Sequence, residues 1–256
     1  MSTNYPTNLD SYTTVATRTR PFASLFEDIS AATVAIETIV GYGDAAPYVM
    51  SVGDSLTLRL GNDAPTLVLG GYREKLYQLA LANGTVLRFV GALTSNPAVG
   101  MVYPNHAGYS GQDTASMLAT HIPAQAATPA PAYVILNIGN NDVKNNTNLG
   151  TFSTRYDSIL TLIATKWTSC KIICMTLGPF SDTAYGSYAY MNADAVAPNA
   201  HILTVGTTGT YASRIAVVDT NSLIPISQTG DGLHWADAGY ATMATALWNN
   251  ALCRIV

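Results

Sequence analysis

The stretch Tyr48-Val-Met-Ser-Val-Gly-Asp-Ser-Leu56 joins an apolar run to a polar turn that carries a serine. Four more apolar runs follow along the chain, separated by segments with helical periodicity. Runs that are apolar throughout, rather than alternating, indicate strands buried on both faces, and hence a parallel sheet with helices on each side. The sequence therefore predicts an α/β fold around a mainly parallel, five-stranded sheet.

The predicted strands are Tyr48–Val52, Val86–Val90, Tyr133–Asn137, Lys171–Met175 and Ile215–Asp219, and the predicted helices span about 66–82, 112–121, 151–167, 185–197 and 236–252. Right-handed crossovers would bring the C-terminal ends of all strands to one edge, where ligands bind in such folds. We therefore expect Ser55, Gly111, Asn141 and the segment 231–234 to gather at that edge.

The pattern changes near residue 45, which predicts an N-terminal segment over 1–45 and a main domain over 46–256. Residues 1–21 are polar and are expected to form an irregular arm, whereas 22–40 have the periodicity of a helix. The apolar positions of that helix alternate in steps of three and four, as in a coiled coil. Two interpretations stay open: a helix docked on its own domain, or a helix that forms a homo-oligomer.

Composition excludes several classes of partner. The chain is 48% hydrophobic and 11% charged, with a net charge of −4, so it lacks the basic excess expected of a nucleic-acid-binding protein. No apolar run approaches the roughly 18 residues of a membrane-spanning helix, so no membrane insertion is expected. The first residues lack the basic start and apolar stretch of a secretion signal, which leaves the localisation open.

Cofactor and metal motifs are also missing from the sequence. There is no glycine-rich phosphate loop, no cluster with metal-ligand spacing and no Gly-x-Ser-x-Gly elbow, so neither a cofactor nor a metal is expected. Three cysteines cannot build a disulfide framework, and Cys170 and Cys174 beside an apolar run are expected to be buried thiols.

Two short segments supply the residue types needed for nucleophilic acyl transfer. Ser55 follows the first predicted strand, and Asp231-Gly-Leu-His234 lies close to the C-terminus. In such chemistry a histidine takes the proton of the serine, while a carboxylate orients the imidazole and stabilises its charge. Because the acid and the base come from one segment, a single loop can present both to Ser55.

Two further segments could donate hydrogen bonds to a developing oxyanion. His106-Ala-Gly-Tyr-Ser-Gly111 contains glycines that allow a backbone N–H to face a cavity without a Cβ in the way. Asn141, in Ile138-Gly-Asn-Asn-Asp142, carries an amide at the end of a predicted strand. Taken singly, each segment is also an ordinary turn.

In the order Ser, Gly, Asn, Asp-x-x-His, these segments resemble the GDSL family of lipolytic enzymes, also called SGNH hydrolases, over about residues 46–256. The resemblance implies a flavodoxin-like three-layer α/β/α sandwich and hydrolysis of esters through an acyl-enzyme. It implies Ser55 as nucleophile, His234 as base and Asp231 as its orienting acid. The oxyanion donors would be the Ser55 N–H, Asn141 and Gly111, with Gly108 as the alternative glycine.

The resemblance also suggests a substrate class. The glycine segment is similar to that of microbial acetyl xylan esterases, which favours short acyl esters, in particular O-acetyl groups on carbohydrate. A thioesterase or lysophospholipase of the same fold, and a non-catalytic carbohydrate-binding module, stay open as alternatives. Candidate substrate contacts are Asp54, Gly108, Tyr109 and Asn140, although Asp54 and Asp142 are also expected to tie their loops to nearby backbone.

Two tyrosine-rich segments, 94–109 and 182–190, are expected to line the cleft because tyrosine combines an apolar face with a hydroxyl. The N-terminal arm resembles linker segments of phage tail and appendage proteins. That likeness suggests a bacterial surface polysaccharide as substrate, with action outside the cell.

Overall fold

The computed structural model describes residues 46–59, 70–95 and 100–252, and all structural statements below concern these residues. The predicted arm and helix of the N-terminal segment lie outside them, so the boundary near residue 45 and the oligomerisation helix stay predictions. Cys253 also lies outside the described residues.

The central sheet is parallel at every pairing of its strands. Its main strands are β1 (Tyr48–Gly53), β2 (Arg88–Val90), β4 (Tyr133–Asn137), β5 (Lys171–Met175) and β8 (Ile215–Val218), in the order β2-β1-β4-β5-β8. A sixth, two-residue strand, β3 (Ala107–Gly108), pairs with the end of β1. The five main strands therefore have the flavodoxin-like order 2-1-3-4-5, and the predicted fold class is confirmed.

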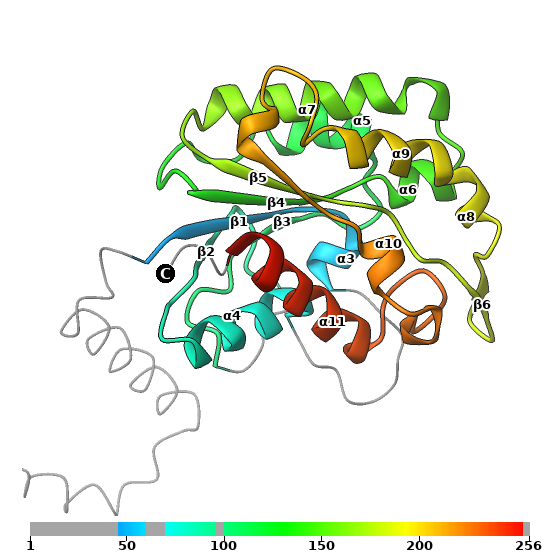
Figure 1. The fold of residues 1–256 in the computed structure, drawn as a ribbon, viewed down its shortest axis with the longest axis horizontal. Coiled ribbons are helices and arrows are strands. Elements are labelled where there is room, and N and C mark those ends of the chain that lie inside the picture. The colour runs from blue at the N-terminus through cyan, green and yellow to red at the C-terminus, as the bar shows by residue number, and fades with distance from the viewer. Residues whose placement is uncertain (1–45, 60–69, 96–99, 253–256) are drawn as a thin grey trace, which may run out of the picture. The chain divides into compact units, whose positions relative to one another are not determined.

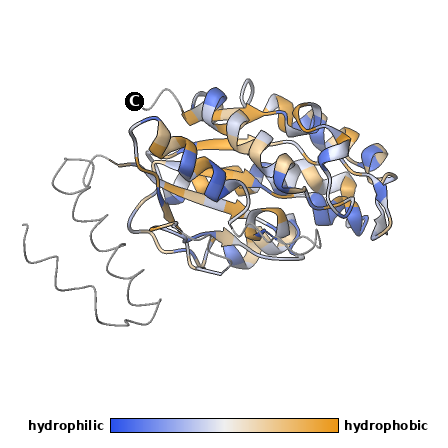
Figure 2. Ribbon diagram, turned by 90° about the horizontal axis from the view of Figure 1, so that it is seen from below, coloured by the Kyte–Doolittle hydropathy of each residue, from blue (hydrophilic) through white to orange (hydrophobic). Residues whose placement is uncertain are grey.

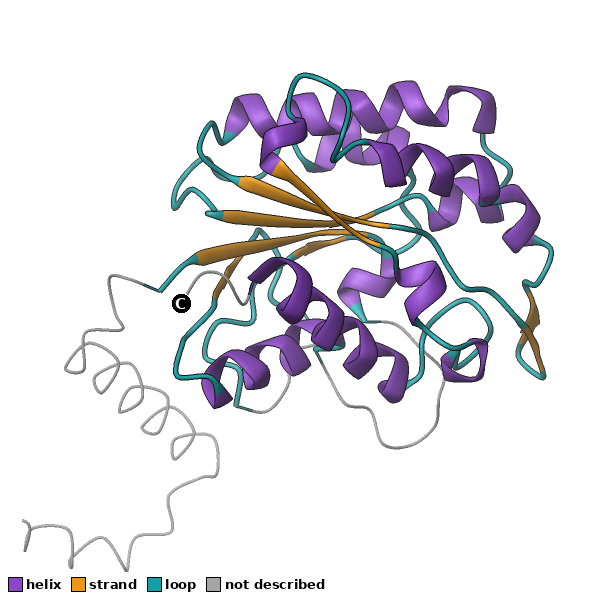
Figure 3. Ribbon diagram, viewed as in Figure 1, coloured by secondary structure: helices purple, strands orange, loops and turns teal. Residues whose placement is uncertain are grey.

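Helices cover both faces of this sheet (Figures 1 and 3). One layer contains α5 (Thr114–Ser116) with the π-helical turn Met117–His121, α6 (Asn140–Lys144), α7 (Phe152–Lys166), α8 (Met191–Asp194) and α9 (Val196–Thr204). The other contains α4 (Tyr72–Ala82) and α11 (Asp237–Leu247), which continues into the π-helical turn Trp248–Leu252. Two short helices, α3 (Ser55–Leu58) and α10 (Thr220–Leu223), follow the C-terminal ends of β1 and β8.

Alternating side chains of the strands form two separate cores. In β4, Val134 and Leu136 are buried against α7, whereas Ile135 is buried on the opposite face with α4 and α11. Figure 2 shows the strands as hydrophobic ribbons between helices of mixed hydropathy. Burial of strands on both faces explains why their sequences are apolar throughout, and each fully buried aliphatic side chain contributes about 1.5–3 kcal/mol.

The predicted helix over 185–197 is wrong in its first half. Residues 182–187 form the hairpin β6 (Asp182–Thr183) and β7 (Gly186–Ser187), and helical structure begins only at Met191. Local side-chain bonds explain the difference: the Thr183 hydroxyl accepts from the N–H of Tyr185, and the Asp182 carboxylate accepts from the N–H of Ala189. Such bonds offer the backbone an alternative to a helix.

Two other findings bear on the sequence predictions. Cys170 and Cys174 are buried free thiols, as predicted. Among the helices of the described ranges, none combines the length and the apolar character needed to span a bilayer.

Candidate active site

Ser55 is presented by a strand-to-helix turn at the C-terminal end of β1. The Asp54 carboxylate caps α3 by accepting from the N–H of Leu56 at 3.0 Å, which places Ser55 at the first helical position. The first N–H groups of a helix have no partner within it, so the Ser55 N–H is available to an anion. The Ser55 residue is 7% exposed, so its hydroxyl lies just below the surface.

The Asp231–His234 loop is folded around a single carboxylate. One oxygen of Asp231 accepts from the N–H groups of Leu233 and His234 at 3.0 and 2.7 Å, and the other contacts His234 Nδ1 at 2.7 Å. Gly232 has a φ of +94°, and a Cβ there would lie 2.3 Å from the Ser181 carbonyl oxygen. The loop therefore needs glycine at this position.

The β6–β7 hairpin and the residue before it hold that loop in place. The N–H of Ser181 donates to the Gly232 carbonyl at 2.9 Å, and the Thr183 hydroxyl donates to the Asp231 carbonyl at 2.9 Å. The hairpin that the sequence missed thus braces the acid–base loop through backbone carbonyls.

His234 connects this loop to Ser55, 179 residues away in the sequence. His234 Nε2 lies 2.8 Å from Ser55 Oγ. Because the ionised Asp231 can only accept, Nδ1 of the neutral ring carries the proton, and Nε2 is left to accept the proton of Ser55. The three predicted residues therefore form one continuous hydrogen-bonded chain.

The ionisation of Asp231 matches its place in this chain. Burial by itself would raise its pKa, but hydrogen bonds from the ring and backbone of His234, attraction to a charged His234 and the bond from Leu233 outweigh it. Together they lower the pKa of Asp231 to about 2. The carboxylate is therefore ionised at neutral pH and can stabilise a protonated imidazole.

The structure separates the two candidate glycine donors. The N–H of Gly108 donates to His106 Nδ1 at 3.1 Å, and Gly108 itself is buried within β3. Gly111 is exposed, adopts a φ of +73°, and has open space where a Cβ would project. The N–H of Gly108 is therefore already committed, whereas Gly111 lies at the surface, and the role of Gly111 as the donor stays a prediction.

His106 does not add a second acid–base group. Burial, helped by the positive charge of Arg73, lowers the pKa of His106 to about 4, although a bond from its ring to Ser95 opposes this. Its Nδ1 accepts from Gly108, so Nε2 carries the proton and donates to the Ser95 carbonyl at 3.0 Å. This neutral ring stabilises the loop before Gly111.

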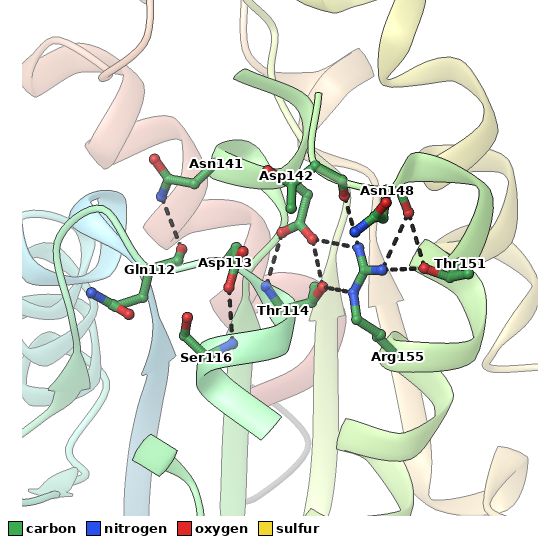
Figure 4. A network of polar contacts seen from close by, with 10 residues as sticks. Gln112, Asp113, Thr114, Ser116, Asn141, Asp142, Asn148, Thr151 and Arg155 are labelled. Carbon is green, nitrogen blue, oxygen red and sulfur yellow. Dashed lines mark hydrogen bonds and ion pairs between the residues drawn. The ribbon is translucent and has the colours of Figure 1, made fainter. Parts of the chain in front are cut away.

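Asn141 lies in α6, directly after β4, and its side chain is aimed toward the glycine segment. Its Nδ2 donates to the Gln112 carbonyl at 2.9 Å (Figure 4). The amide nitrogen carries two hydrogens, so this bond orients the amide and leaves the second hydrogen for another acceptor. The residue is only 5% exposed, which fixes its position.

A buried ion pair fastens Asn141 to the glycine segment (Figure 4). The carboxylate of Asp142, fully buried, accepts from the N–H and hydroxyl of Thr114 at 2.9 and 2.5 Å and from Arg155 Nη2 at 2.8 Å. Arg155 also donates through Nε to the Thr114 hydroxyl at 2.7 Å, and contacts the Asn148 carbonyl and Thr151. Sequence reasoning missed Thr114 and Arg155, and no local pattern marks Arg155 because its partners lie on other elements.

Three predicted substrate contacts, Asp54, Asn140 and Gly108, are buried in this structure, and their contact with substrate stays a prediction. Asp54 is fully buried and accepts from Leu56 and from Asn140 Nδ2 at 3.1 Å, which makes it a bracing residue between β1 and β4. Asn140 is 3% exposed and Gly108 lies inside the sheet edge. Burial raises the pKa of Asp54 to about 6, against the lowering effect of its hydrogen bonds and of His234.

Tyr109 is half-buried, and its contact with substrate stays a prediction. Its ring stacks on His121 at 3.9 Å between centroids, and its hydroxyl accepts from Gln125 at 2.9 Å. No group of three potential metal ligands occurs among the residues that the structure describes.

Comparison with known proteins identifies the class of this fold and site. The model of the GDSL-like lipase/acylhydrolase family matches residues 51–242. The chain therefore belongs to the GDSL-like lipase/acylhydrolase family, as its four motifs indicated. It is a carboxylic ester hydrolase.

Solved structures with the same fold come from several organisms. A family 3 carbohydrate esterase from Clostridium thermocellum is 21% identical with a TM-score of 0.62, and the match covers 82% of this chain and 97% of that one. A family 3 carbohydrate esterase from Talaromyces cellulolyticus is 19% identical, with a TM-score of 0.62 and coverages of 82% and 98%. An acetylxylan esterase from Geobacillus stearothermophilus is 19% identical, with a TM-score of 0.56 and coverages of 80% and 93%. A search of curated proteins gave no match.

Proposed function

We propose that this ester hydrolase removes short acyl groups, principally O-acetyl groups, from carbohydrate. The observation that carries the proposal is the chain of two short contacts, 2.8 Å from Ser55 Oγ to His234 Nε2 and 2.7 Å from His234 Nδ1 to Asp231. This arrangement has the geometry of a serine nucleophile with its general base and orienting carboxylate.

In the proposed mechanism, His234 Nε2 takes the Ser55 proton as Oγ attacks the ester carbonyl carbon. The tetrahedral oxyanion accepts from the N–H groups of Ser55 and Gly111 and from the second hydrogen of Asn141. The protonated imidazole then gives its proton to the departing sugar hydroxyl, and the C–O bond of the ester breaks. Water, deprotonated by His234, attacks the acyl-enzyme and releases the carboxylic acid and Ser55.

The surroundings of the acid–base loop favour a sugar over a long acyl chain. The β6–β7 hairpin, which is bonded to the Asp231 loop, carries Tyr185 at 65% exposed, and Tyr190 follows at 53% exposed. Exposed tyrosines offer a flat apolar face and a hydroxyl, which suit a sugar ring. Two family 3 carbohydrate esterases and one acetylxylan esterase share the fold, which also supports an acetylated carbohydrate as substrate.

The test compares substrates of the purified protein that differ in the length of the acyl chain and in the group to which the acyl chain is attached. Acetate release from acetylated polysaccharides is measured beside hydrolysis of p-nitrophenyl esters of two to twelve carbons and of an acyl thioester. We expect acetyl esters of carbohydrate to have the highest kcat/KM; a preference for the thioester or for the long-chain p-nitrophenyl esters would contradict the proposed substrate class.

A variant pair tests the nucleophile. Ser55→Ala should abolish turnover and labelling by a serine-directed phosphonate, whereas Ser158→Ala, at a half-buried position of α7, should leave both unchanged. Full activity in Ser55→Ala would exclude the proposed mechanism.

A further inference from the structure

A second cavity lies at the β2 edge of the sheet, and none of the residues of the candidate active site lines it. Its volume is about 390 Å³, within the range of small-ligand sites. It is lined by Tyr48 and Met50 of β1, by Arg88 of β2, and by Tyr103, Asn105 and Thr128 from loops. Tyr48 begins β1 and Gly53 ends it, so about 17 Å of strand separates Tyr48 of this cavity from the turn that carries Ser55.

Among the described residues that line the cavity, Arg88 is the single charged one. Its Nη1 donates to the Tyr48 hydroxyl at 3.2 Å, and its guanidinium carbon lies 5.5 and 5.9 Å from the ring centroids of Tyr48 and Tyr103. Cation–π contacts at such distances hold the guanidinium between the two rings.

No acid neutralises Arg88 within the described part of the chain. None of the ion pairs recorded there includes it, and its Nε is buried without an acceptor from those residues. A guanidinium has five N–H donors in a planar fork that matches a carboxylate. Within the described part of the chain, this cavity therefore carries a positive charge that no carboxylate neutralises, in a protein whose net charge is −4.

The rest of the lining suits a ring that carries hydroxyl groups. Tyr48 and Tyr103 combine aromatic faces with hydroxyls, and the amide of Asn105 is held in place by a bond from its Nδ2 to the Gly91 carbonyl at 3.2 Å. Met50, Ala124 and Ala126, which also line the cavity, supply an apolar surface. A ligand that has both a carboxylate and a ring with hydroxyl groups would satisfy each of these features.

We propose that the cavity at the β2 edge binds a carboxylated sugar, a uronate unit, with its carboxylate on Arg88 and its ring beside Tyr103. Binding of the uronate does not depend on catalysis. Its role as a remote subsite for an acidic, acetylated polysaccharide rests on the proposed function, because only a polymer would reach both this cavity and Ser55.

The experiment measures binding of D-glucuronate, D-glucose and acetate to the intact protein by saturation-transfer and chemical-shift NMR. We expect glucuronate to bind in the millimolar range or tighter, and glucose and acetate each to bind at least tenfold more weakly. Raising the salt concentration should weaken glucuronate binding, because a carboxylate–guanidinium contact is screened when partly exposed.

Variants locate the binding. Arg88→Met should weaken glucuronate binding about tenfold or more, the loss typical of a hydrogen bond to a charged group. Arg88→Lys keeps the positive charge but lacks the planar fork of N–H donors. Its affinity for glucuronate should therefore lie between those of Arg88→Met and the unaltered protein. Lys171→Met removes an exposed cation at the start of β5 and should leave glucuronate binding unchanged. Thermal unfolding checks that each variant is folded. The salt dependence of glucuronate binding is measured on the unaltered protein, so that test holds even if a variant does not fold.

The outcomes separate this proposal from the proposed function. Equal binding of glucose and glucuronate, equal binding of acetate and glucuronate, or binding that survives Arg88→Met would overturn the uronate site. Hydrolysis of p-nitrophenyl acetate should be unchanged in Arg88→Met, whereas KM for an acetylated uronate oligosaccharide should rise. Loss of esterase activity in Ser55→Ala bears on the catalytic proposal alone, because glucuronate should still bind to that variant.

Discussion

Replacement of Asp142 by alanine should lower the stability of the protein and should also impair the proposed oxyanion donors, Gly111 and Asn141. The Asp142 side chain is 0% exposed and that of Arg155 is 15% exposed, with 2.8 Å between Oδ1 and Nη2. Asp142→Ala would leave a guanidinium without its counter-charge, and an N–H and a hydroxyl of Thr114 without their acceptor. Breaking a buried ion pair from one side typically costs about 3–5 kcal/mol.

For a domain of this size, 1 kcal/mol shifts Tm by about 2–4 °C, so Asp142→Ala should lower Tm by about 6–20 °C. Thr114 lies three residues after Gly111, and Asn141 directly precedes Asp142, so loss of the carboxylate should also loosen both donors. We therefore expect kcat for p-nitrophenyl acetate to fall with little change in KM, which is the signature of an interaction lost in the transition state.

Urea unfolding of a double-mutant cycle separates this ion pair from general damage. Asp142→Ala, Arg155→Met and the double variant are compared, with Ser158→Ala as a neutral control on the same helix as Arg155. In the double variant the uncompensated charge is absent, so its loss of stability should be smaller than the sum of the two single losses. Additive losses, or a fall below about 1 kcal/mol in Asp142→Ala, would refute the argument.

Three further predictions concern the other parts of the site. Asn141→Ala should lower kcat by about 100- to 1000-fold, the usual cost of one oxyanion donor, and an unchanged kcat in steady-state assays would exclude that role. Gly111→Ala has room for its Cβ but must hold a φ of +73°, so calorimetry should record a loss of about 1–2 kcal/mol; unchanged stability would contradict this conformation. The pKa of Asp231 is lowered to about 2 from 3.8, so its ionised form stabilises the fold above pH 3.8, and that contribution is lost as the pH falls toward 2. The difference in unfolding free energy between the protein and Asp231→Asn should therefore shrink by about 1–2 kcal/mol over that range in urea titrations, and a pH-independent difference would argue against it.

The sequence by itself determined the sheet and the edge at which the site is built. Strands buried on both faces are apolar throughout, so β4 and β5 were predicted with the bounds that the structure has. The C-terminal ends of parallel strands lie at one edge, which is why Ser55, Gly111 and Asn141 could be expected there from order alone. Elsewhere the local signal was ambiguous: β2 begins at Arg88 instead of Val86, and the tyrosine-rich segment after Phe180 forms a hairpin before its helix.

Only the tertiary structure decided which groups are committed to each other. The sequence could not distinguish Gly108 from Gly111. In the structure the N–H of Gly108 donates to His106, whereas Gly111 has open space where a Cβ would project. Asp54 and Asn140 lie within the motifs that resemble the family, yet they bond to each other in the interior. Arg155 and Arg88 carry no sequence signal, because what matters about a guanidinium is whether a carboxylate lies beside it. Hydrogen bonds and ion pairs act over a few ångströms. Two residues that lie this close in space can be far apart in the sequence, so their pairing is decided only when the folded sheet brings their loops together.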